Sequence, residues 1–500
     1  MDKKLRLFLI ILFTFVFLTR FSLSIFSPLK FWDETIYVNL GRNIILFGEY
    51  SFSHGFSDFA PNMPLAGFRP PLLPFLIAFL SLFTFNTIIL SFLMSIISAL
   101  GVIAFFFLVY VMFNKNIAIY SSLLLSVLPL YVFWGSKILT DSLFITFILL
   151  SSFLFWKLFF VKKSGLFAFL FGLSCALAFY SRYSFIWFIP VFFLTLLFKD
   201  RNLKFLEDKH LWISIIIFFV FVGPWFIYNY FEYGSLLGFL FQSKQALARW
   251  GVDSLFNYYK DVKENIIILL PFVFLGLFYK ANNNKNNKKN SVDKINKINK
   301  NKLNNNNNNN KDINGHTEKN AKSFWILWFI IISLFLIFLD NKEGRYLLPL
   351  LPSICVLASL GLNNIKIRKY SYYFLLVIIL FFVVVNFFIF LNAFQEFQYK
   401  DENCFFKTMN YLKNSDANYV ITEHFSPSYF YTSKPSIRAD NYTSIEYLLK
   451  NVYQNDTIFY YYVDGDWFNL KKEELKTENF LIYSCEDQEI YDLSSINLAE

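Results

Sequence analysis

Residues 87–113 read TIILSFLMSIISALGVIAFFFLVYVMF, a run without a charged residue. At about 1.5 Å per residue, a helix of this length crosses the hydrocarbon core of a bilayer, which is roughly 30 Å thick. Inside a bilayer the chain must satisfy its own backbone polar groups, so such a run predicts a helix. We therefore expect residues 87–113 to span a membrane.

The rest of the chain has the same apolar character. Of its 500 residues 56% are hydrophobic, 68 are phenylalanine and only 16% are charged, and the mean hydropathy is +0.43. Because soluble domains carry about 25% charged residues, this composition excludes a soluble globular enzyme. Ten further apolar stretches predict spans at residues 5–26, 117–134, 142–160, 165–181, 184–198, 211–230, 265–279, 323–339, 346–362 and 371–392. The predicted fold class is thus a polytopic α-helical membrane protein with about 11 spans.

The basic residues between the spans predict the orientation of the chain. A cytoplasmic N-terminus places all of the most basic loops in the cytoplasm, as the positive-inside rule requires. These loops hold Lys115, Lys162 with Lys163, residues 199–209, the Lys/Asn tract and residues 366–369. Counting residues 70–85 as a span would reverse the later loops, so this stretch is predicted to be an interfacial or re-entrant helix. The net charge of +10 therefore reflects orientation, and no nucleic-acid partner is expected.

The chain divides into four predicted regions of a multi-pass protein of the cell membrane. They are a first transmembrane part (1–279) with an outer loop (27–86), a disordered Lys/Asn-rich cytoplasmic linker (280–322), a second transmembrane part (323–392) and an extracytoplasmic domain (393–500). The linker has no aromatic residue and no hydrophobic periodicity, which is typical of disorder.

The C-terminal region has the composition of a small soluble domain. Residues 419–422 and 457–463 predict strands, and residues 444–452 predict a helix, so an α/β domain is expected. The sequence leaves open whether Cys404 and Cys485 form a disulfide. The sequence indicates no cofactor with certainty, and it leaves open whether a divalent metal is bound.

The first outer segment carries the most informative acidic residues. Asp33 and Glu34 stand at the start of a predicted helix with Ile36, Leu40 and Ile44 on one face, which is typical of a helix in the membrane interface. One interpretation makes Asp33 an N-cap, and spacing alone favours it. The other makes it a general base that is held where a polar acceptor meets a lipid-borne donor.

Other charged residues belong to the same predicted outer face. Arg69, Asp141, Arg182 and Arg345 all lie in outer loops or at outer span ends. Arginine binds phosphate with two parallel hydrogen bonds, so Arg69 and Arg345 suit a phosphate-bearing lipid. For any one arginine alone, snorkelling or anchoring at the interface is the simpler account.

Several short motifs in this order resemble a known family. They are Trp32-Asp33-Glu34-Thr35-Ile36-Tyr37, Arg69-Pro70-Pro71-Leu72, the loop with Asp141, Pro224-Trp225 with Asn229, and Arg345-Tyr346-Leu347-Leu348-Pro349. Together they resemble membrane glycosyltransferases of the GT-C fold, in the branch of the protein O-mannosyltransferases and the aminoarabinose transferases of lipid A. The likeness covers roughly residues 1–392. It implies an inverting transfer from a polyprenyl- or dolichyl-phosphate sugar to a protein, lipid or glycan acceptor at the outer face.

The resemblance also implies roles for the candidate residues. It makes Asp33 the base that deprotonates the acceptor hydroxyl, with Glu34 as the fallback, and it gives Asp141 a role in orienting the acceptor or the base. It places Arg69 and Arg345 at the donor phosphate, where Arg182 is a further candidate. Two features depart from the family: the first pair is Asp-Glu, and Arg69 stands where relatives often have His or Lys.

Three alternatives remain at this point: a secondary transporter, an oligosaccharyltransferase and an inactive membrane scaffold. A transporter is expected to show paired Gly/Pro-broken helices in two matched halves, which the sequence does not show. An oligosaccharyltransferase is expected to carry a Trp-Trp-Asp-Tyr-Gly-like segment in its tail, and none is seen. The sequence also has no G-x-G-x-x-G or G-x-x-x-x-G-K-[ST] motif, which weighs against a nucleotide-sugar enzyme or an ATP-driven pump.

Overall fold

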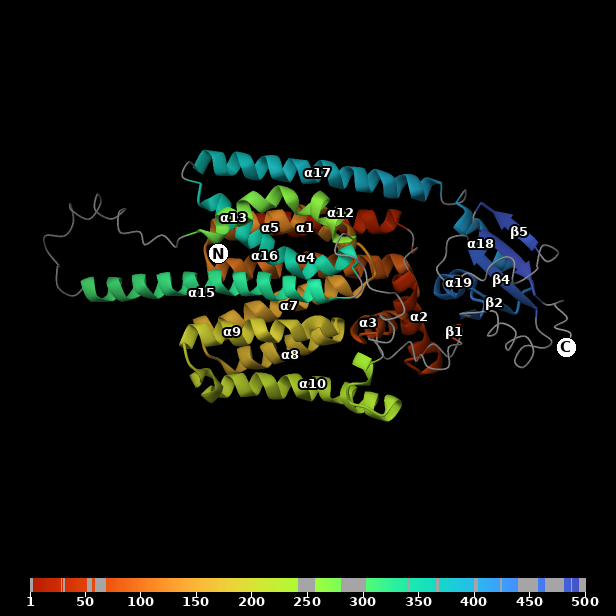
Figure 1. Cartoon of the computed structure of the whole chain (residues 1–500), viewed down its shortest axis with the longest axis horizontal. Coiled ribbons are helices and arrows are strands. Elements are labelled where there is room, and N and C mark those ends of the chain that lie inside the picture. Colours follow the sequence, from red (N-terminus) through yellow and green to blue (C-terminus); the bar gives the residue numbers. More distant parts are fainter. Residues whose placement is uncertain are drawn as a thin grey trace.

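A bundle of long helices carries a small α/β region at one end (Figure 1). The computed structural model describes residues 3–27, 29, 32–51, 56–58, 69–241, 257–279, 303–339, 342–365, 368–399, 403–422, 425–438, 457–463, 481–486 and 488–493.

Helices occupy all eleven apolar stretches that the sequence singles out. They are α1 (Lys3–Phe26), α4 (Thr87–Met112), α5 (Lys115–Val127) with α6 (Pro129–Gly135), α7 (Thr140–Trp156) with a π-helical turn (Lys157–Val161), α8 (Gly165–Ser181), α9 (Ile189–Asp200) after the 3-10 helix η2 (Tyr183–Phe188), α10 (Lys209–Tyr233), α13 (Leu270–Leu277) after η4 (Ile267–Leu269), α15 (Leu303–Phe338), α16 (Leu351–Asn363) after η5 (Gly344–Leu350), and α17 (Arg368–Gln398). Within the described residues eight helices are long and apolar enough to cross a membrane, or nine if α5 and α6 form one bent span. The chain is therefore a multi-pass membrane protein. The sequence predicts eleven spans, and the two that are not counted here correspond to the shorter helices α8 and η4–α13.

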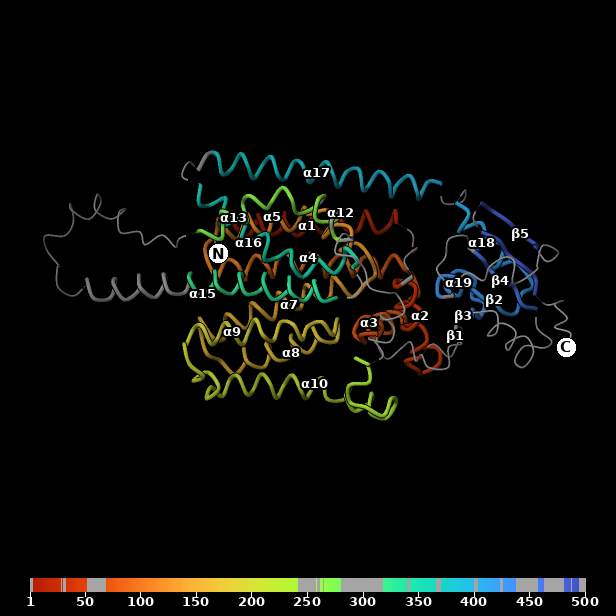
Figure 2. The backbone as a smooth tube through the Cα atoms, in the orientation of Figure 1, coloured from red at the N-terminus to blue at the C-terminus, as the bar shows by residue number. Residues whose placement is uncertain are grey.

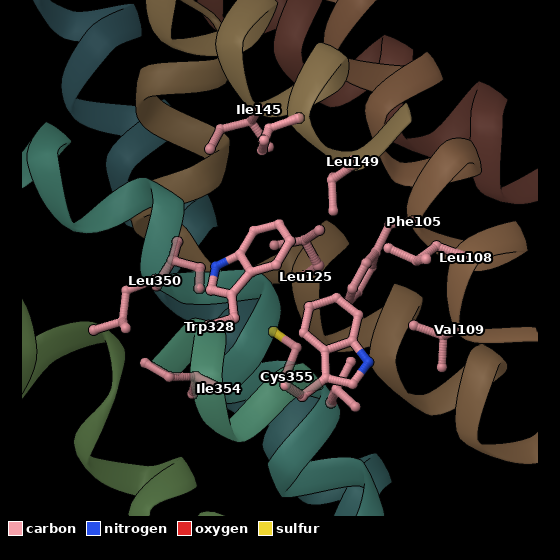
Figure 3. Packing of buried hydrophobic residues seen from close by; sticks show 14 of the residues in the cluster. Phe105, Leu108, Val109, Leu125, Ile145, Leu149, Trp328, Leu350, Ile354 and Cys355 are labelled. Carbon is pink, nitrogen blue, oxygen red and sulfur yellow. The ribbon is translucent and has the colours of Figure 1, made fainter. Parts of the chain in front are cut away.

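Small residues set the closest helix contacts in the bundle. A Cβ on Gly276 of α13 would lie 1.9 Å from the Leu357 carbonyl oxygen of α16, and one on Gly361 would lie 2.0 Å from that of Phe272. Only glycine permits this approach, which matches the small-residue interfaces of membrane helices. Larger side chains fill the remaining space: Figure 3 shows Trp328 packed near Leu350, Ile354 and Cys355, with Phe105 and Leu125 close by.

The span formed by α5 and α6 is broken, with a bend of 62° between the two helices. Pro129 begins α6 and has no backbone N–H, so the helical hydrogen-bond ladder cannot continue through it. Polar side chains of other segments satisfy the groups at the break: Arg20 donates to the Ser126 carbonyl (2.7 Å), Asn386 donates to the Val127 carbonyl (2.8 Å), and Asn265 accepts from the Leu130 N–H (2.7 Å). The bundle thus stabilises a break that directs α6 toward the loop before α7.

Two further helices lie between the bundle and the C-terminal region (Figure 1). They are α2 (Trp32–Phe47) and α3 (Leu72–Ser81), and they pack closely against one another where Gly41 meets Ile77. With 10 residues α3 is too short to cross a bilayer. It lies within the stretch 70–85, which the charge pattern predicts to be an interfacial or re-entrant helix and not a span.

The C-terminal region is α/β and shares its sheet with the segment before α3. The region contains the helices α18 (Cys404–Asn414) and α19 (Phe425–Thr432), and the strands of the sheet are β1 (Phe56–Asp58), β2 (Tyr419–Ile421), β3 (Ser436–Arg438), β4 (Ile458–Val463), β5 (Leu481–Cys485) and β6 (Gln488–Asp492). The short helix α12 (Asn257–Asn265) belongs to the helical bundle. The order is β1-β3-β2-β4-β6-β5, with β1, β3, β2 and β4 parallel and β6 antiparallel to both neighbours. Strands β2 and β4 match the two predicted strands, and the predicted helix at 444–452 lies outside the described residues.

A disulfide joins the beginning and the end of this region. Cys404 of α18 is bonded to Cys485 of β5, with Cα atoms 5.6 Å apart. The pairing settles the question that the sequence leaves open. Cys175 and Cys355 are buried in the helical bundle as free thiols.

The predicted disordered linker at 280–322 overlaps with a helix. Residues 303–322 belong to α15, and residues 280–302 lie outside the described part of the chain. A helix that is already formed in the membrane extends at the cost of one ordered residue per added hydrogen bond, which allows α15 to continue past its apolar part.

Candidate active site

The candidate site lies at the end of the bundle that carries α2 and α3, next to the C-terminal sheet (Figure 2). Four segments meet there: the first turn of α2, the residues from Arg69 to the start of α3, the loop between α6 and α7, and η5 before α16. Three of the predicted site residues, Asp33, Arg69 and Arg345, are brought together although they are far apart in the sequence.

Asp33 bridges two arginines. One carboxylate oxygen lies 2.7 Å from Nη1 of Arg69, and the other lies 2.5 Å from Nη1 of Arg345. The side chains are only 13%, 11% and 14% exposed, so solvent screens these ion pairs weakly. Helix α2 begins at Trp32, so Asp33 lies inside its first turn and not at the capping position.

Burial and the two arginines act in opposite directions on Asp33. Burial raises its pKa because the charged form loses hydration, but Arg69 and Arg345 stabilise the carboxylate and hold the pKa well below its usual range. Asp33 raises the pKa of Arg69 in return, against the effect of burial. The three groups therefore form an ionised cluster with a net charge of +1.

Arg345 is held from several sides at the start of η5. Its Nε lies 2.5 Å from a carboxylate oxygen of Glu343, and its guanidinium stacks over the rings of Tyr346 (5.4 Å) and Trp134 (5.9 Å). Gly344 allows the Asp261 carboxylate of α12 to approach, since a Cβ would lie 2.5 Å from Oδ2. These contacts fix the direction in which the guanidinium points.

A second ion pair adjoins the first. Asp141, in the first turn of α7, pairs with Arg182, which follows α8. The Arg182 guanidinium lies 5.0 Å from the centre of the Tyr346 ring, the ring that Arg345 also contacts. Tyr346 thus links the two ion pairs, and both belong to one site.

Glu34 has a different environment from its neighbour Asp33. It is 2% exposed, and one of its carboxylate oxygens accepts the backbone N–H of Ile138 (2.9 Å) in the loop before α7. In the same loop Lys137 is buried, donates to Ser27 and lies over the Phe133 ring at 5.1 Å. Glu34 therefore ties α2 to the loop that leads to Asp141.

The C-terminal region contacts α2 directly. The hydroxyls of Thr35 and Ser426 are 3.0 Å apart, and Asn39 donates to the Ser426 carbonyl (3.2 Å). The guanidinium of Arg42 stacks over the Phe430 ring at 4.9 Å. Helix α19 thus contacts the helix that carries Asp33. No pattern in the sequence predicts this contact.

Sequence reasoning missed some members of the site. Glu343 and Tyr346 contact the arginines of the ion pairs, but the sequence assigns no role to either. Glu343 carries a detectable signal, because a charged residue beside a predicted span is expensive. Among the described residues there is no group of three or more His, Cys, Asp or Glu side chains placed to hold a metal ion.

Comparisons with known proteins extend the resemblance seen in the sequence. A family model described as dolichyl-phosphate-mannose-protein mannosyltransferase matches residues 68–228. No curated protein matches the chain in sequence. The structure of ArnT from Cupriavidus metallidurans bound to undecaprenyl phosphate is 12% identical with a TM-score of 0.68, over 98% of this chain and 99% of that chain.

A second similar structure is the archaeal oligosaccharyltransferase AglB from Archaeoglobus fulgidus in complex with an inhibitory peptide and a dolichol-phosphate. It is 10% identical with a TM-score of 0.58, over 100% of this chain and 75% of that chain. The fold of the chain is that of the GT-C membrane glycosyltransferases, as the sequence resemblance predicts. Within that fold, the matched family model is the one of the dolichyl-phosphate-mannose-protein mannosyltransferases. Nothing in these comparisons favours the transporter alternative.

Proposed function

We propose that this chain is a membrane glycosyltransferase that moves a sugar from a polyprenyl- or dolichyl-phosphate donor to an acceptor hydroxyl, with inversion at the anomeric carbon. The observation that carries the proposal is the Asp33–Arg69–Arg345 cluster at one end of a GT-C bundle. Similar structures hold undecaprenyl phosphate and dolichol-phosphate, which are lipids with one phosphate head group.

The chemistry of the reaction matches the charges of the cluster. The acceptor oxygen forms a bond to the anomeric carbon while the bond from that carbon to the phosphate oxygen breaks. The hydroxyl proton goes to the Asp33 carboxylate, and the electron pair of the broken bond stays on the lipid phosphate. Arg69 and Arg345 stabilise the charge that develops there.

The ion pairs of Asp33 add a condition to this mechanism. Asp33 is a weak base while two arginines hold its pKa low. A donor phosphate is a second anion for the same guanidiniums, so its arrival draws Arg69 and Arg345 away from the carboxylate. The pKa of Asp33 then rises toward its usual range, and the base becomes effective once the donor is bound.

The remaining candidates take supporting roles in the proposal. Asp141 and Arg182 lie near Arg345, because the Tyr346 ring contacts both arginines. In this position they orient the acceptor or contribute to binding of the donor phosphate. Glu34 holds the loop before α7 through the Ile138 N–H, and it is the second choice for the base.

We also propose that the N-terminus is cytoplasmic and that the site faces the outside. In support, the connections from α7 to α8 and from α9 to α10 lie at the end of the bundle opposite α2 and α3 (Figure 1). Lys163, Lys199 and Lys204, which belong to or adjoin these connections, lie close together. The four predicted regions are kept in this proposal with two changes. Residues 303–322 of the linker belong to α15, and the outer loop 27–86 and residues 393–500 act as one unit, because β1 pairs with β3.

The test is transfer of labelled sugar from a panel of polyprenyl- and dolichyl-phosphate sugars in membranes that contain the full chain. We expect transfer to require a lipid-phosphate donor and to be lost in Asp33→Asn. Glu34→Gln and Asp141→Asn are compared at equal expression. Full transfer by Asp33→Asn together with loss in Glu34→Gln would move the base to Glu34. A chain that is correctly inserted and consumes none of the donors would contradict the proposal.

A further inference from the structure

The backbone carbonyl of Arg69 accepts hydrogen bonds from two tyrosines. The Tyr50 hydroxyl donates to it at 2.9 Å and the Tyr183 hydroxyl at 3.3 Å. A carbonyl oxygen has two lone pairs, so these donors use its full capacity. Pro70 follows Arg69 and restricts it to extended backbone conformations. The backbone of Arg69 is thus held by its chain neighbour and by two side chains.

The two tyrosines come from different parts of the fold, and a third aromatic residue joins them. Tyr50 follows α2, Tyr183 begins η2 after α8, and Trp225 lies within α10. The Trp225 indole N–H donates to the Tyr183 hydroxyl oxygen at 3.0 Å, and its ring meets that of Tyr50 edge-on at 5.6 Å. Three segments therefore converge on one carbonyl group.

The direction of these hydrogen bonds is determined by the chemistry of the donors. An indole N–H can only donate, so the Tyr183 oxygen is the acceptor and its own proton is available for Arg69. Burial, followed by nearby tyrosines, raises the pKa of Tyr50 well above its usual value, so its hydroxyl stays protonated. Both phenols are thus donors to the Arg69 carbonyl.

The arrangement has a direct consequence for the Arg69 side chain. Its guanidinium lies 5.6 Å from the Tyr37 ring and 2.7 Å from Asp33, so the side chain enters the site from a fixed backbone. A misplacement of about 1 Å in a group that positions a substrate can lower a rate by about a hundredfold. Packing alone needs the rings of Tyr50 and Tyr183, whereas the placement of Arg69 needs their hydroxyls.

We propose that Tyr50, Tyr183 and Trp225 are positioning residues that fix the Arg69 backbone, so that its guanidinium meets the phosphate of the lipid donor. This inference rests on the proposed function. It gives a role to the Pro224-Trp225 motif, and it makes α10 part of the structure that positions Arg69.

The test measures binding of undecaprenyl phosphate and of dolichyl phosphate to the full chain in lipid nanodiscs. Tyr50→Phe and Tyr183→Phe remove one hydroxyl each and keep the rings. We expect each to weaken binding about 3- to 10-fold, the effect of one net hydrogen bond. The acceptor KM is expected to stay unchanged, while the donor KM rises.

A matched control is available on the same helix contact. Tyr180 donates its hydroxyl to the Phe221 carbonyl of α10 at 2.6 Å but has no bond to Arg69. Tyr180→Phe is expected to leave lipid-phosphate binding within twofold of the wild type. The melting temperature of each variant shows whether it is folded.

The discriminating measurement is a double-mutant cycle with Arg69→Ala. If the tyrosines act through Arg69, Tyr183→Phe has no further effect on binding in the Arg69→Ala background. An equal effect in both backgrounds, or binding by Tyr50→Phe and Tyr183→Phe equal to the wild type, would overturn the inference and leave the proposed function intact. If the wild-type chain binds neither lipid phosphate, both fail together.

Discussion

Substituting Asp33 by asparagine separates the two tasks that the proposed function gives this residue. As a base, Asp33 is needed for transfer, and loss of a general base costs about 10²- to 10⁴-fold in rate. As a competitor, it occupies the guanidiniums of Arg69 and Arg345 when no donor is present. Asp33→Asn is therefore expected to abolish transfer and at the same time to tighten binding of the lipid phosphate.

The magnitude of the second effect follows from the contacts. Asp33 makes two charge-assisted hydrogen bonds in a weakly exposed setting, and hydrogen bonds to charged groups are worth about 1.5–3 kcal/mol each. In the wild type, the phosphate must displace one of these Asp33 hydrogen bonds before it can bind the arginine. In Asp33→Asn this cost is absent. A gain of about 1.5 kcal/mol corresponds to roughly tenfold tighter binding of undecaprenyl phosphate.

The assay is equilibrium binding of undecaprenyl phosphate to the chain in nanodiscs, with the shift in melting temperature as a second readout. Glu34→Gln is the matched control, because it removes the same charge from the adjacent residue while that carboxylate binds the Ile138 N–H. We expect it to change binding less than twofold. Binding by folded Asp33→Asn that is weaker than in the wild type would refute the competition between carboxylate and phosphate.

Three other outcomes are expected from the same structure. Arg345→Lys keeps the charge but cannot reach Asp33 and Glu343 together, so donor affinity should fall about tenfold in the binding assay, and an unchanged affinity would exclude Arg345 from the phosphate grip. Ser426→Ala removes the hydroxyl that contacts Thr35, so the free energy of unfolding should fall by about 1 kcal/mol in a thermal melt. The same change should lower kcat and leave the donor KM unchanged. A kcat equal to that of the wild type would show that α19 does not position α2. Cys404→Ser should cost roughly 2–4 kcal/mol of stability, measured by thermal unfolding against Cys175→Ser, and equal losses in both would argue against the disulfide.

The pH dependence of stability is a further check on the ion pairs of Asp33. Its folded-state pKa lies below the unfolded value, so its contribution to stability is present above the ordinary carboxyl range and is lost as the pH falls through the folded-state pKa. We expect thermal unfolding of the wild type to show this acidic loss and Asp33→Asn to lack that part of it. Identical acid profiles would contradict the assignment.

The sequence predicts the membrane part of the fold well, because hydropathy and length are properties of a continuous segment. It also predicts that Asp33, Arg69 and Arg345 share one face, since the positive-inside rule orients whole loops. It does not predict which charges pair. Arg182, which the resemblance makes a further candidate for the donor phosphate, forms an ion pair with Asp141 that no sequence pattern predicts.

Contacts between distant segments explain the rest of what the sequence could not predict. Strand β1 is only three residues long, and its pairing with β3, far away in the sequence, makes it a strand. Tyr50 and Tyr183 resemble ordinary interfacial aromatic residues until Arg69 is placed between them. No periodicity records such meetings, because each depends on how several helices pack.

The bond between Thr35 and Ser426 joins residues that are 391 positions apart. During synthesis, α2 enters the membrane long before the ribosome has made α19, and β1 has no partner until β3 follows. Arg345 also arrives late, in η5. A chain that ends before residue 426 therefore contains Asp33 but lacks the contact between α19 and α2. If it ends before residue 345, it also lacks Arg345. The contacts that hold α2 and complete the Asp33 ion pairs can therefore form only when translation is nearly finished.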